Sequence, residues 1–181
     1  MSTEPPPNIP ANKTTPAAQN PTTKPPALLV TWHDLPPWQQ DNHYIHTGYR
    51  PASSSYHTSL HSLTYLHNET LNIYTHLFGA LLALLAIPIL YTNLLPRYQR
   101  GTVEDVAVFG AFFGGAVVCL GMSATYHALA NHSERVARAG NRLDYLGIVV
   151  LIWGSFVPSI YYGFAREPAL VRGYWSMVSY Y

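Results

Sequence analysis

The sequence has little cysteine and little charge, and each shortage excludes a class of protein. Cys119 is the only cysteine, so the chain forms neither an internal disulfide nor a thiolate zinc finger. Charged residues make up 10% of the chain, against roughly 25% in an average soluble domain. Lys and Arg (10) nearly balance Asp and Glu (9), without a basic cluster, which argues against nucleic acid as a partner. Cys119 itself lies in an apolar run and is interpreted as a small packing residue.

Proline, by contrast, is abundant, and it is concentrated at the N-terminus. Residues 1–26 contain 8 of the 15 prolines and almost no large apolar group. Such a composition cannot bury enough surface to offset the entropy of ordering, so we predict a disordered tail, ending at about residue 31. The tail also lacks the basic start and apolar core of a secretory signal peptide. Residues 32–58 include Trp32, Trp38 and Gly48, which is typical of an ordered, irregular juxtamembrane segment.

Long uncharged apolar runs make up most of the remaining chain. Residues 70–96 carry no formal charge and exceed the ~20 residues that cross a bilayer. We expect a helix from about residue 59 and, within residues 59–181, spans at about 70–95, 106–131 and 143–164. A fourth apolar run begins at 173–181 and stops after about two turns, so the chain is expected to be truncated. The predicted fold class is all-α and integral to the membrane.

The prolines, glycines and arginines in and between these spans predict helix kinks, a packing face and an orientation in the membrane. Pro88 and Pro158 should kink the first and third spans. Gly110 and Gly114 have the spacing of a close-packing helix face. The arginines favour a cytosolic N-terminus, since the loop after the second span has three (Arg135, Arg138 and Arg142) and the other two loops have two each.

A serine, a histidine and an aspartate stand where hydrocarbon is expected. Ser123 and His127 are four residues apart, on one helix face, and Asp144 opens the next apolar run. A charged group inside a span costs roughly 3 kcal/mol or more, so it indicates a functional site. His127 is a candidate zinc ligand, with Ser123 and Asp144 around the metal or its water, and Asp144 as general base. The alternative for His127 is a hydrogen-bonded interior histidine.

Two further groups of polar residues precede or enter the first span. Glu69, Asn72 and His76 lie on one helix face, which with the predicted orientation shares the cytosolic edge with His127 and Asp144. They are interpreted as partners of an interior group, as a structural hydrogen-bond cluster, or as a solvated helix end, and His76 could be a second zinc ligand. The pair His57 and His61 has metal-binding spacing but no carboxylate nearby, and is interpreted as exposed and non-functional.

Several motifs, in order, resemble the progestin and adipoQ receptors, a family that includes the adiponectin receptors and is related to the haemolysin-III proteins. The motifs are residues 32–51, His67-Asn-Glu-Thr-Leu-Asn72 through His76, Ser123-x3-His127, His132-Ser-Glu, Leu143-Asp144-Tyr and Gly154-Ser-Phe-Val-Pro158. The resemblance implies the first three to four helices of a seven-helix bundle with a cytosolic N-terminus. It implies zinc bound by His127 and by two histidines of a His-x3-His motif on the last helix, with Ser123 and Asp144 as polar partners. This chain would hold one of those three ligands.

The resemblance leaves three functions open. The first is a zinc-dependent intramembrane amide hydrolase acting on ceramide-like or fatty acyl lipids, with Asp144 handling the proton and Ser123 orienting ligand or water. The second is a receptor with structural zinc and an extracellular protein ligand. The third is a regulator of lipid or metal homeostasis without turnover. Each implies a multi-pass protein of the plasma membrane or endoplasmic reticulum. The chain by itself is expected to insert but to be unstable, to bind zinc weakly and to be inactive.

Overall fold

The computed structural model describes residues 27–97 and 101–179, and it is built around three long helices that lie side by side. These are α2 (Thr70–Arg97), α3 (Val103–Leu129) and α4 (Glu134–Gly163). Each is long and apolar enough to cross a membrane. Within the two described ranges there is no β-strand, only an isolated bridge between Val30 and Tyr49. The prediction of an all-helical membrane protein is confirmed, while the predicted disorder of residues 1–26 falls outside the described residues.

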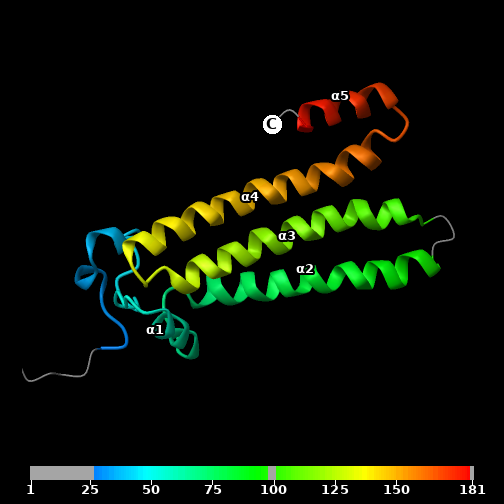
Figure 1. Ribbon diagram of the computed structural model, residues 1–181. Helices are drawn as coiled ribbons and strands as arrows, with labels where there is room; N and C mark the ends of the chain where they lie inside the picture. Colours follow the sequence, from blue (N-terminus) through cyan, green and yellow to red (C-terminus); the bar gives the residue numbers. More distant parts are fainter. Residues whose placement is uncertain (1–26, 98–100, 180–181) are drawn as a thin grey trace, which may run out of the picture.

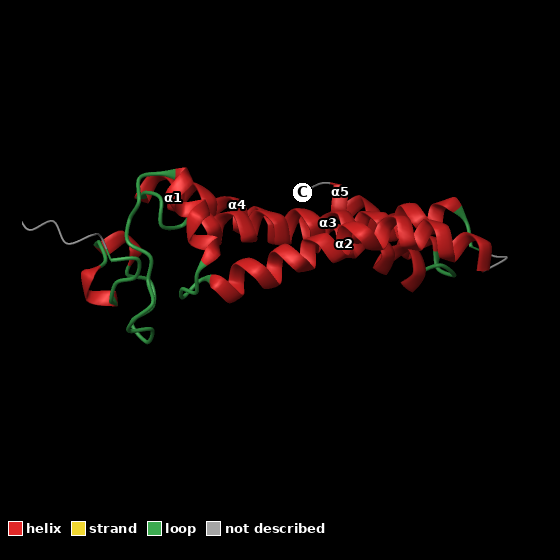
Figure 2. Ribbon diagram, turned by 90° about the horizontal axis from the view of Figure 1, so that it is seen from below, coloured by secondary structure: helices red, strands yellow, loops and turns green. Residues whose placement is uncertain are grey.

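The central helix of the three is α3, which packs against both α2 and α4. Short connections make neighbouring helices antiparallel, so the start of α2, the end of α3 and the start of α4 lie at the same end of the bundle (Figure 1). The short helix α1 (Tyr56–His61) and the juxtamembrane segment cover that end, while α5 (Pro168–Ser179) follows α4 at the other (Figures 1 and 2).

The third long helix begins nine residues before the expected start at 143, because Ser133 caps it. The Ser133 hydroxyl accepts a bond from the Val136 amide, and Glu134 and Arg138 form an i,i+4 ion pair of 3.3 Å. Arg135, Arg138 and Arg142 therefore lie in the first turns of α4 and not in a loop. Pro158 lies inside α4, and Pro88 inside α2, and both helices continue beyond the proline.

The helix expected to run unbroken from residue 59 is interrupted before the first span. It ends with α1 and a 3-10 turn, Ser62–Thr64, after which Tyr65 is extended (φ −138°, ψ 160°). The backbone of the break is bonded elsewhere: the Asn68 amide donates to the Gly48 carbonyl at 2.8 Å, and the His67 amide to the Thr70 hydroxyl at 2.8 Å. These bonds replace helical ones, so α2 begins at Thr70.

The juxtamembrane segment is folded against the turn between α3 and α4. Val30 exchanges two backbone bonds with Tyr49, at 2.8 and 3.2 Å, so the ordered region begins before the expected boundary at residue 31. The amides of Ser53 and Ser54 donate to the carbonyls of Asn131 and His132 at 2.9 and 2.8 Å. Gly48 has φ +85°, a conformation that favours glycine, and this turn returns the chain to Val30.

The close contact between α3 and α4 uses other glycines than the pair predicted. A Cβ on Gly110 or Gly114 would meet no atom of the described residues within 4 Å, so this pair does not form the contact between α3 and α4. A Cβ on Gly154 would instead lie 2.6 Å from the Ala111 carbonyl oxygen, and one on Gly147 would lie 2.9 Å from the Cys119 Cα. We call this contact the glycine seam, and it consists of Ala111, Gly115 and Cys119 of α3 with Gly147, Leu151 and Gly154 of α4.

Candidate functional site

The polar residues of the long helices meet at the end of the bundle that the juxtamembrane segment covers. Glu69 precedes the first residue of α2, and His76 lies two turns into that helix. Ser123 and His127 lie in the last two turns of α3. Because α2 and α3 are antiparallel, the four side chains are brought to the same level, as their positions in the sequence predict.

His127 is bound to a carboxylate. Its Nδ1 lies 2.7 Å from Glu69 Oε2, and the two side chains are 20% and 17% exposed. Glu69 is itself fixed by two amides, since Asn68 Nδ2 donates to Oε1 and Asn72 Nδ2 to Oε2, each at 2.8 Å. Burial acts to raise the pKa of Glu69, but the bonds from His127 and Asn72 and the nearby positive charge of Arg50 lower it below its usual value. The carboxylate is therefore ionised and oriented toward His127.

A second histidine is bound to the candidate serine. His76 Nδ1 lies 2.8 Å from Ser123 Oγ, and Ser123 is only 4% exposed. The rings of His76 and His127 are 6.2 Å apart, centroid to centroid, and nearly perpendicular at 70°. In both histidines the bonded atom is Nδ1, which makes Nε2 the nitrogen that can bind a further group.

Arg50 caps the C-terminal end of α3. The residue is 2% exposed, and its Nη2 donates to the His127 carbonyl at 2.6 Å, while Nη1 donates to the Ala128 carbonyl at 2.9 Å and to Ser62 Oγ at 2.8 Å. The last carbonyls of a helix have no partner within it, and a cation there is favourable. Burial lowers the pKa of Arg50 to about 10, so the residue remains charged at neutral pH.

Arg50 was not among the site residues predicted from the sequence. Its signal in the sequence was a single cation within an aromatic segment, beside Gly48 and Pro51. That pattern shows that the segment is ordered, but not which helix end the guanidinium meets.

Asp144 lies on the α4 side of the site, without a bond to the other predicted residues. Gly140 packs against Tyr126 and Gly147 against Cys119, so Asp144, between them on the same face of α4, is level with the stretch of α3 that contains Ser123. Asp144 is partly buried, and among the described residues it has no hydrogen bond or ion pair with Ser123 or His127. The structure thus brings Ser123 and His127 together with Glu69 and His76, and leaves Asp144 apart from them.

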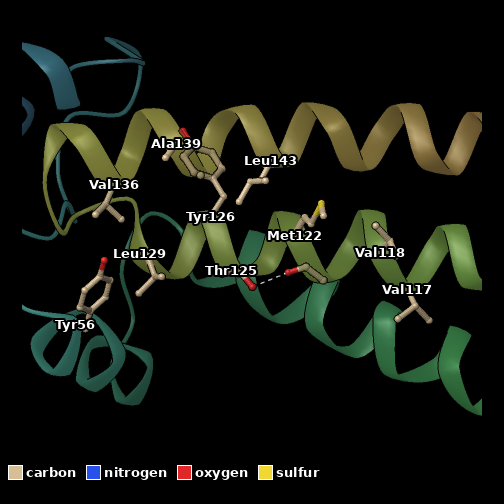
Figure 3. Close-up of a pocket in the computed structure, with 12 residues that line it drawn as sticks. Tyr56, Val117, Val118, Met122, Thr125, Tyr126, Leu129, Val136, Ala139 and Leu143 are labelled. Carbon is tan, nitrogen blue, oxygen red and sulfur yellow. Dashed lines mark hydrogen bonds between the residues drawn. The ribbon is translucent and has the colours of Figure 1, made fainter. Parts of the chain in front are cut away.

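Two hollows share the Tyr126 side chain as part of their walls. The smaller, about 90 Å³, is polar and adjoins Glu69 and His127. The larger, about 460 Å³, lies between α3, α4 and α1 (Figure 3). Its lining is largely apolar, and the Thr125 hydroxyl in its wall is already bound to the Gly121 carbonyl at 2.8 Å. Hydrocarbon therefore fits the larger hollow better than a polar ligand does.

The residues of the site suit one part of a zinc centre. His127 has Nδ1 fixed by a carboxylate and Nε2 available, which is the arrangement that orients histidine ligands in metal sites. No group of three His, Cys, Asp or Glu side chains within residues 27–97 and 101–179 is placed to hold a metal ion. His57 and His61 are both exposed on α1, with ring centroids 6.5 Å apart, and they belong to a different surface.

Comparison with known proteins identifies the family of the chain. The sequence profile described as "Haemolysin-III related" matches residues 64–181, which is more than half of the chain. The chain belongs to the haemolysin-III-related family. Its similarity to the progestin and adipoQ receptors, expected from the motifs, is confirmed by relatives that carry those names.

Three relatives of this haemolysin-III-related chain show how much of each protein it covers. It is 44% identical over 133 residues to the adiponectin receptor protein of Drosophila melanogaster, covering 74% of the chain and 29% of that protein. The ADIPOR-like receptor IZH2 of Saccharomyces cerevisiae is 41% identical over 142 residues, 78% of the chain and 44% of the relative. The progestin and adipoQ receptor-like protein 1 of Caenorhabditis elegans is 42% identical over 154 residues, which cover 83% of the chain and 34% of the relative. The chain spans less than half the length of each.

Proposed function

We propose that this haemolysin-III-related protein acts as a zinc-dependent membrane hydrolase of lipid amides, with His127 as one zinc ligand. The observation that carries the proposal is the 2.7 Å contact between Glu69 Oε2 and His127 Nδ1 at the edge of a membrane span. A carboxylate bound to one imidazole nitrogen fixes the tautomer and directs the other nitrogen toward a metal. The remaining ligands come from outside the residues described.

Each polar residue of the chain has a separate part in this proposal. Zinc, when bound, lowers the pKa of its water to about 7 and so supplies a hydroxide nucleophile. Ser123 holds His76 and orients ligand or water near His127. The Asp144 carboxylate would take the proton that the attacking water releases and return it to the leaving amine, since Asp144 faces α3 at the level of Ser123 and has no bond to Ser123 or His127.

A lipid with a hydrocarbon chain, ceramide-like or fatty acyl, is the proposed substrate. The larger hollow supports this choice, because its wall is apolar and shares Tyr126 with the polar pocket beside His127. The Tyr126 ring lies 4.9 Å from the His127 ring, centroid to centroid. An acyl chain in the hollow would bring its polar end toward the histidine.

The alternative function is that of a receptor or a regulator of lipid or metal homeostasis, in which zinc is structural. The names of the Drosophila and yeast relatives, both receptors, favour it. In this case an extracellular protein ligand changes the packing of the helices, and Glu69, His76 and Ser123 act only as a hydrogen-bond cluster. Zinc would then be present without amide turnover.

The test compares zinc content and amide turnover in the same preparations. It uses this chain and a version continued by the part of the yeast relative that follows the matched region. We expect weak zinc binding by the chain alone and stoichiometric zinc in the extended protein. His127→Ala should lose zinc outright, whereas Asp144→Ala should keep zinc at an affinity or activity about 10–100-fold lower. Ser123→Ala should fall between the wild type and Asp144→Ala.

The outcomes separate the two functions. Full zinc in the His127→Ala protein would overturn the proposed site. Stoichiometric zinc without turnover of a long-chain ceramide would favour the receptor or regulator. Orientation is tested separately by protease protection in sealed vesicles, where the N-terminus should be cytosolic and the connection between α2 and α3 on the opposite face.

A further inference from the structure

A small polar pocket lies between the juxtamembrane segment and the Glu69–His127 pair. Its volume is about 90 Å³. The juxtamembrane segment forms its outer wall, with the exposed Asp41 among the lining residues, and Glu69 and His127 lie on its inner side. We call it the antechamber.

Three residues that line the antechamber each have one buried polar atom without a hydrogen-bond partner among the described residues. The atoms are Gln39 Oε1, Arg50 Nε and Asn131 Oδ1, and they account for three of the four such atoms in the described part of the chain. Arg50 and Asn131 are 2% and 3% exposed. An unsatisfied buried polar group costs about 1–3 kcal/mol, and native proteins leave few of them. Their concentration in one pocket indicates a shared partner.

The other bonds of these side chains fix which atoms face the pocket. Gln39 Nε2 donates to the Arg50 carbonyl at 2.8 Å, and Asn131 Nδ2 donates to the Pro51 carbonyl at 3.1 Å. Turning either amide over would place an oxygen against a carbonyl, so both amide oxygens are the atoms left for the antechamber. Both terminal nitrogens of Arg50 are bound to α3, which leaves Nε.

The chemistry of the three atoms selects the occupant. Two are acceptors and one is a donor. An anion is repelled by the two amide oxygens and by the carboxylates of Asp41 and Glu69, and a cation offers no acceptor for the Arg50 Nε–H. Water donates two bonds and accepts others, so it satisfies all three. The volume holds about two or three waters at roughly 30 Å³ each.

We propose that the antechamber binds ordered water, which completes the bonds of Gln39, Arg50 and Asn131 and joins the surface at Asp41 to the Glu69 carboxylate. The water reaches the Glu69–His127 pair from the juxtamembrane side, independently of the membrane interior. This inference goes beyond the proposed function, because it holds equally for a hydrolase and for a receptor.

The test is water-edited solid-state NMR of the metal-free chain in lipid bilayers, which measures magnetisation transfer from water to individual sites. The Arg50 Nε–H signal should receive transfer from water despite its burial, whereas the amide of Ile73, equally buried at 2%, should not. Gln39→Leu and Asn131→Leu, made singly, should each lose that transfer. Gln40→Leu is the matched control, because the Gln40 amide donates to the carbonyls of Trp32 and Leu35 and does not line the antechamber.

The result that overturns the proposal is obtained on the wild type, so it does not depend on any variant folding. If Arg50 Nε–H receives no more transfer than the Ile73 amide, the antechamber is dry. Unchanged transfer in both Gln39→Leu and Asn131→Leu would also overturn it, since the water would then be bound elsewhere. Because no metal or substrate is present, neither result depends on whether the protein hydrolyses amides.

Discussion

The two sides of α3 are held by different physical means. On the side facing α4, the glycine seam brings backbone against backbone, as the 2.6 Å between a Cβ on Gly154 and the Ala111 carbonyl shows. On the side facing α2, the nearest glycine, Gly79, meets only the flexible end of Leu120, at 3.0 Å, and specific bonds join His76 to Ser123 and Glu69 to His127. We call this second side the polar edge. It consists of Glu69, His76, Ser123 and His127, together with Arg50, which binds the end of α3.

The difference shows how a membrane helix can be fixed on one side and functional on the other. Lipid is as apolar as a helix surface, so close packing of small residues supplies much of the attraction between spans. Polar side chains are costly in that environment and are kept where they have partners. Contact through the glycine seam fixes where α3 lies, and the polar edge then presents His127 at a defined place.

The largest effect is expected from removing the cation of the polar edge. Arg50→Leu leaves the buried carbonyls of His127 and Ala128 without donors, and we expect a loss of about 3 kcal/mol in the free energy of unfolding. Steric trapping in bicelles measures it. Arg138→Leu is the control, since its pair with Glu134 is exposed and should cost at most about 1 kcal/mol. Equal losses in the two variants would contradict the role of Arg50.

A smaller loss should follow from filling the glycine seam. Gly154→Leu forces a side chain against the Ala111 backbone, which cannot yield as a flexible side chain does, and should cost about 2 kcal/mol or more. Gly110→Leu is matched in residue type and helix environment but meets open space, so it should be nearly neutral. The same unfolding measurement applies. If Gly110→Leu is the more damaging change, the helices pack through the other face.

Acid should lower the free energy of unfolding by protonating His67, which lies in the non-helical segment before α2. Burial and the charge of Arg50 lower the pKa of His67 to about 4, although Glu69 opposes them, and the Glu69 amide donates to His67 Nδ1 at 3.1 Å. The folded state therefore binds fewer protons than the unfolded state between pH 6.5 and 4, so stability is complete above about 6.5 and falls as pH approaches 4. At pH 5 the loss would be about 2 kcal/mol if His67 were fully shielded, and partial exposure reduces it to about 1 kcal/mol.

The measurement for His67 is the free energy of unfolding between pH 7.5 and 4.5. His67→Gln, which does not titrate, should flatten the fall over this range. A fall of the same size in that variant would assign the acid sensitivity to another group.

The smallest effect should come from the hydroxyl of the polar edge. Ser123→Ala removes the bond to His76 Nδ1, and bonds between helices in membranes average about 0.6 kcal/mol. Thr125→Ala is the control, because the Thr125 hydroxyl bonds to the Gly121 carbonyl of its own helix. A loss several times larger than 0.6 kcal/mol for Ser123→Ala would mean that His76 depends on Ser123 for more than one bond.

The all-helical membrane class, the three spans and the family could all be predicted from the sequence. These follow from uncharged runs that have no stable place outside hydrocarbon, and from motifs that appear in a fixed order. The sequence also placed Glu69, His76, Ser123 and His127 at one end of the bundle, because short connections make adjacent spans antiparallel. Helical spacing added that Glu69 and His76 share one face of their helix and that Ser123 and His127 share one face of α3.

The bonding partner of each polar residue, by contrast, depends on how the helices pack in three dimensions. Spacing does not give the rotation and axial shift of one helix against the next, so it did not show that Glu69 binds His127 while His76 binds Ser123. For the same reason it did not show that α3 meets α4 through Gly147 and Gly154 and not through the Gly110–Gly114 face. The break before α2 and the capping by Arg50 depend on backbone groups of a distant, irregular segment, and hydrophobic periodicity carries no information about them.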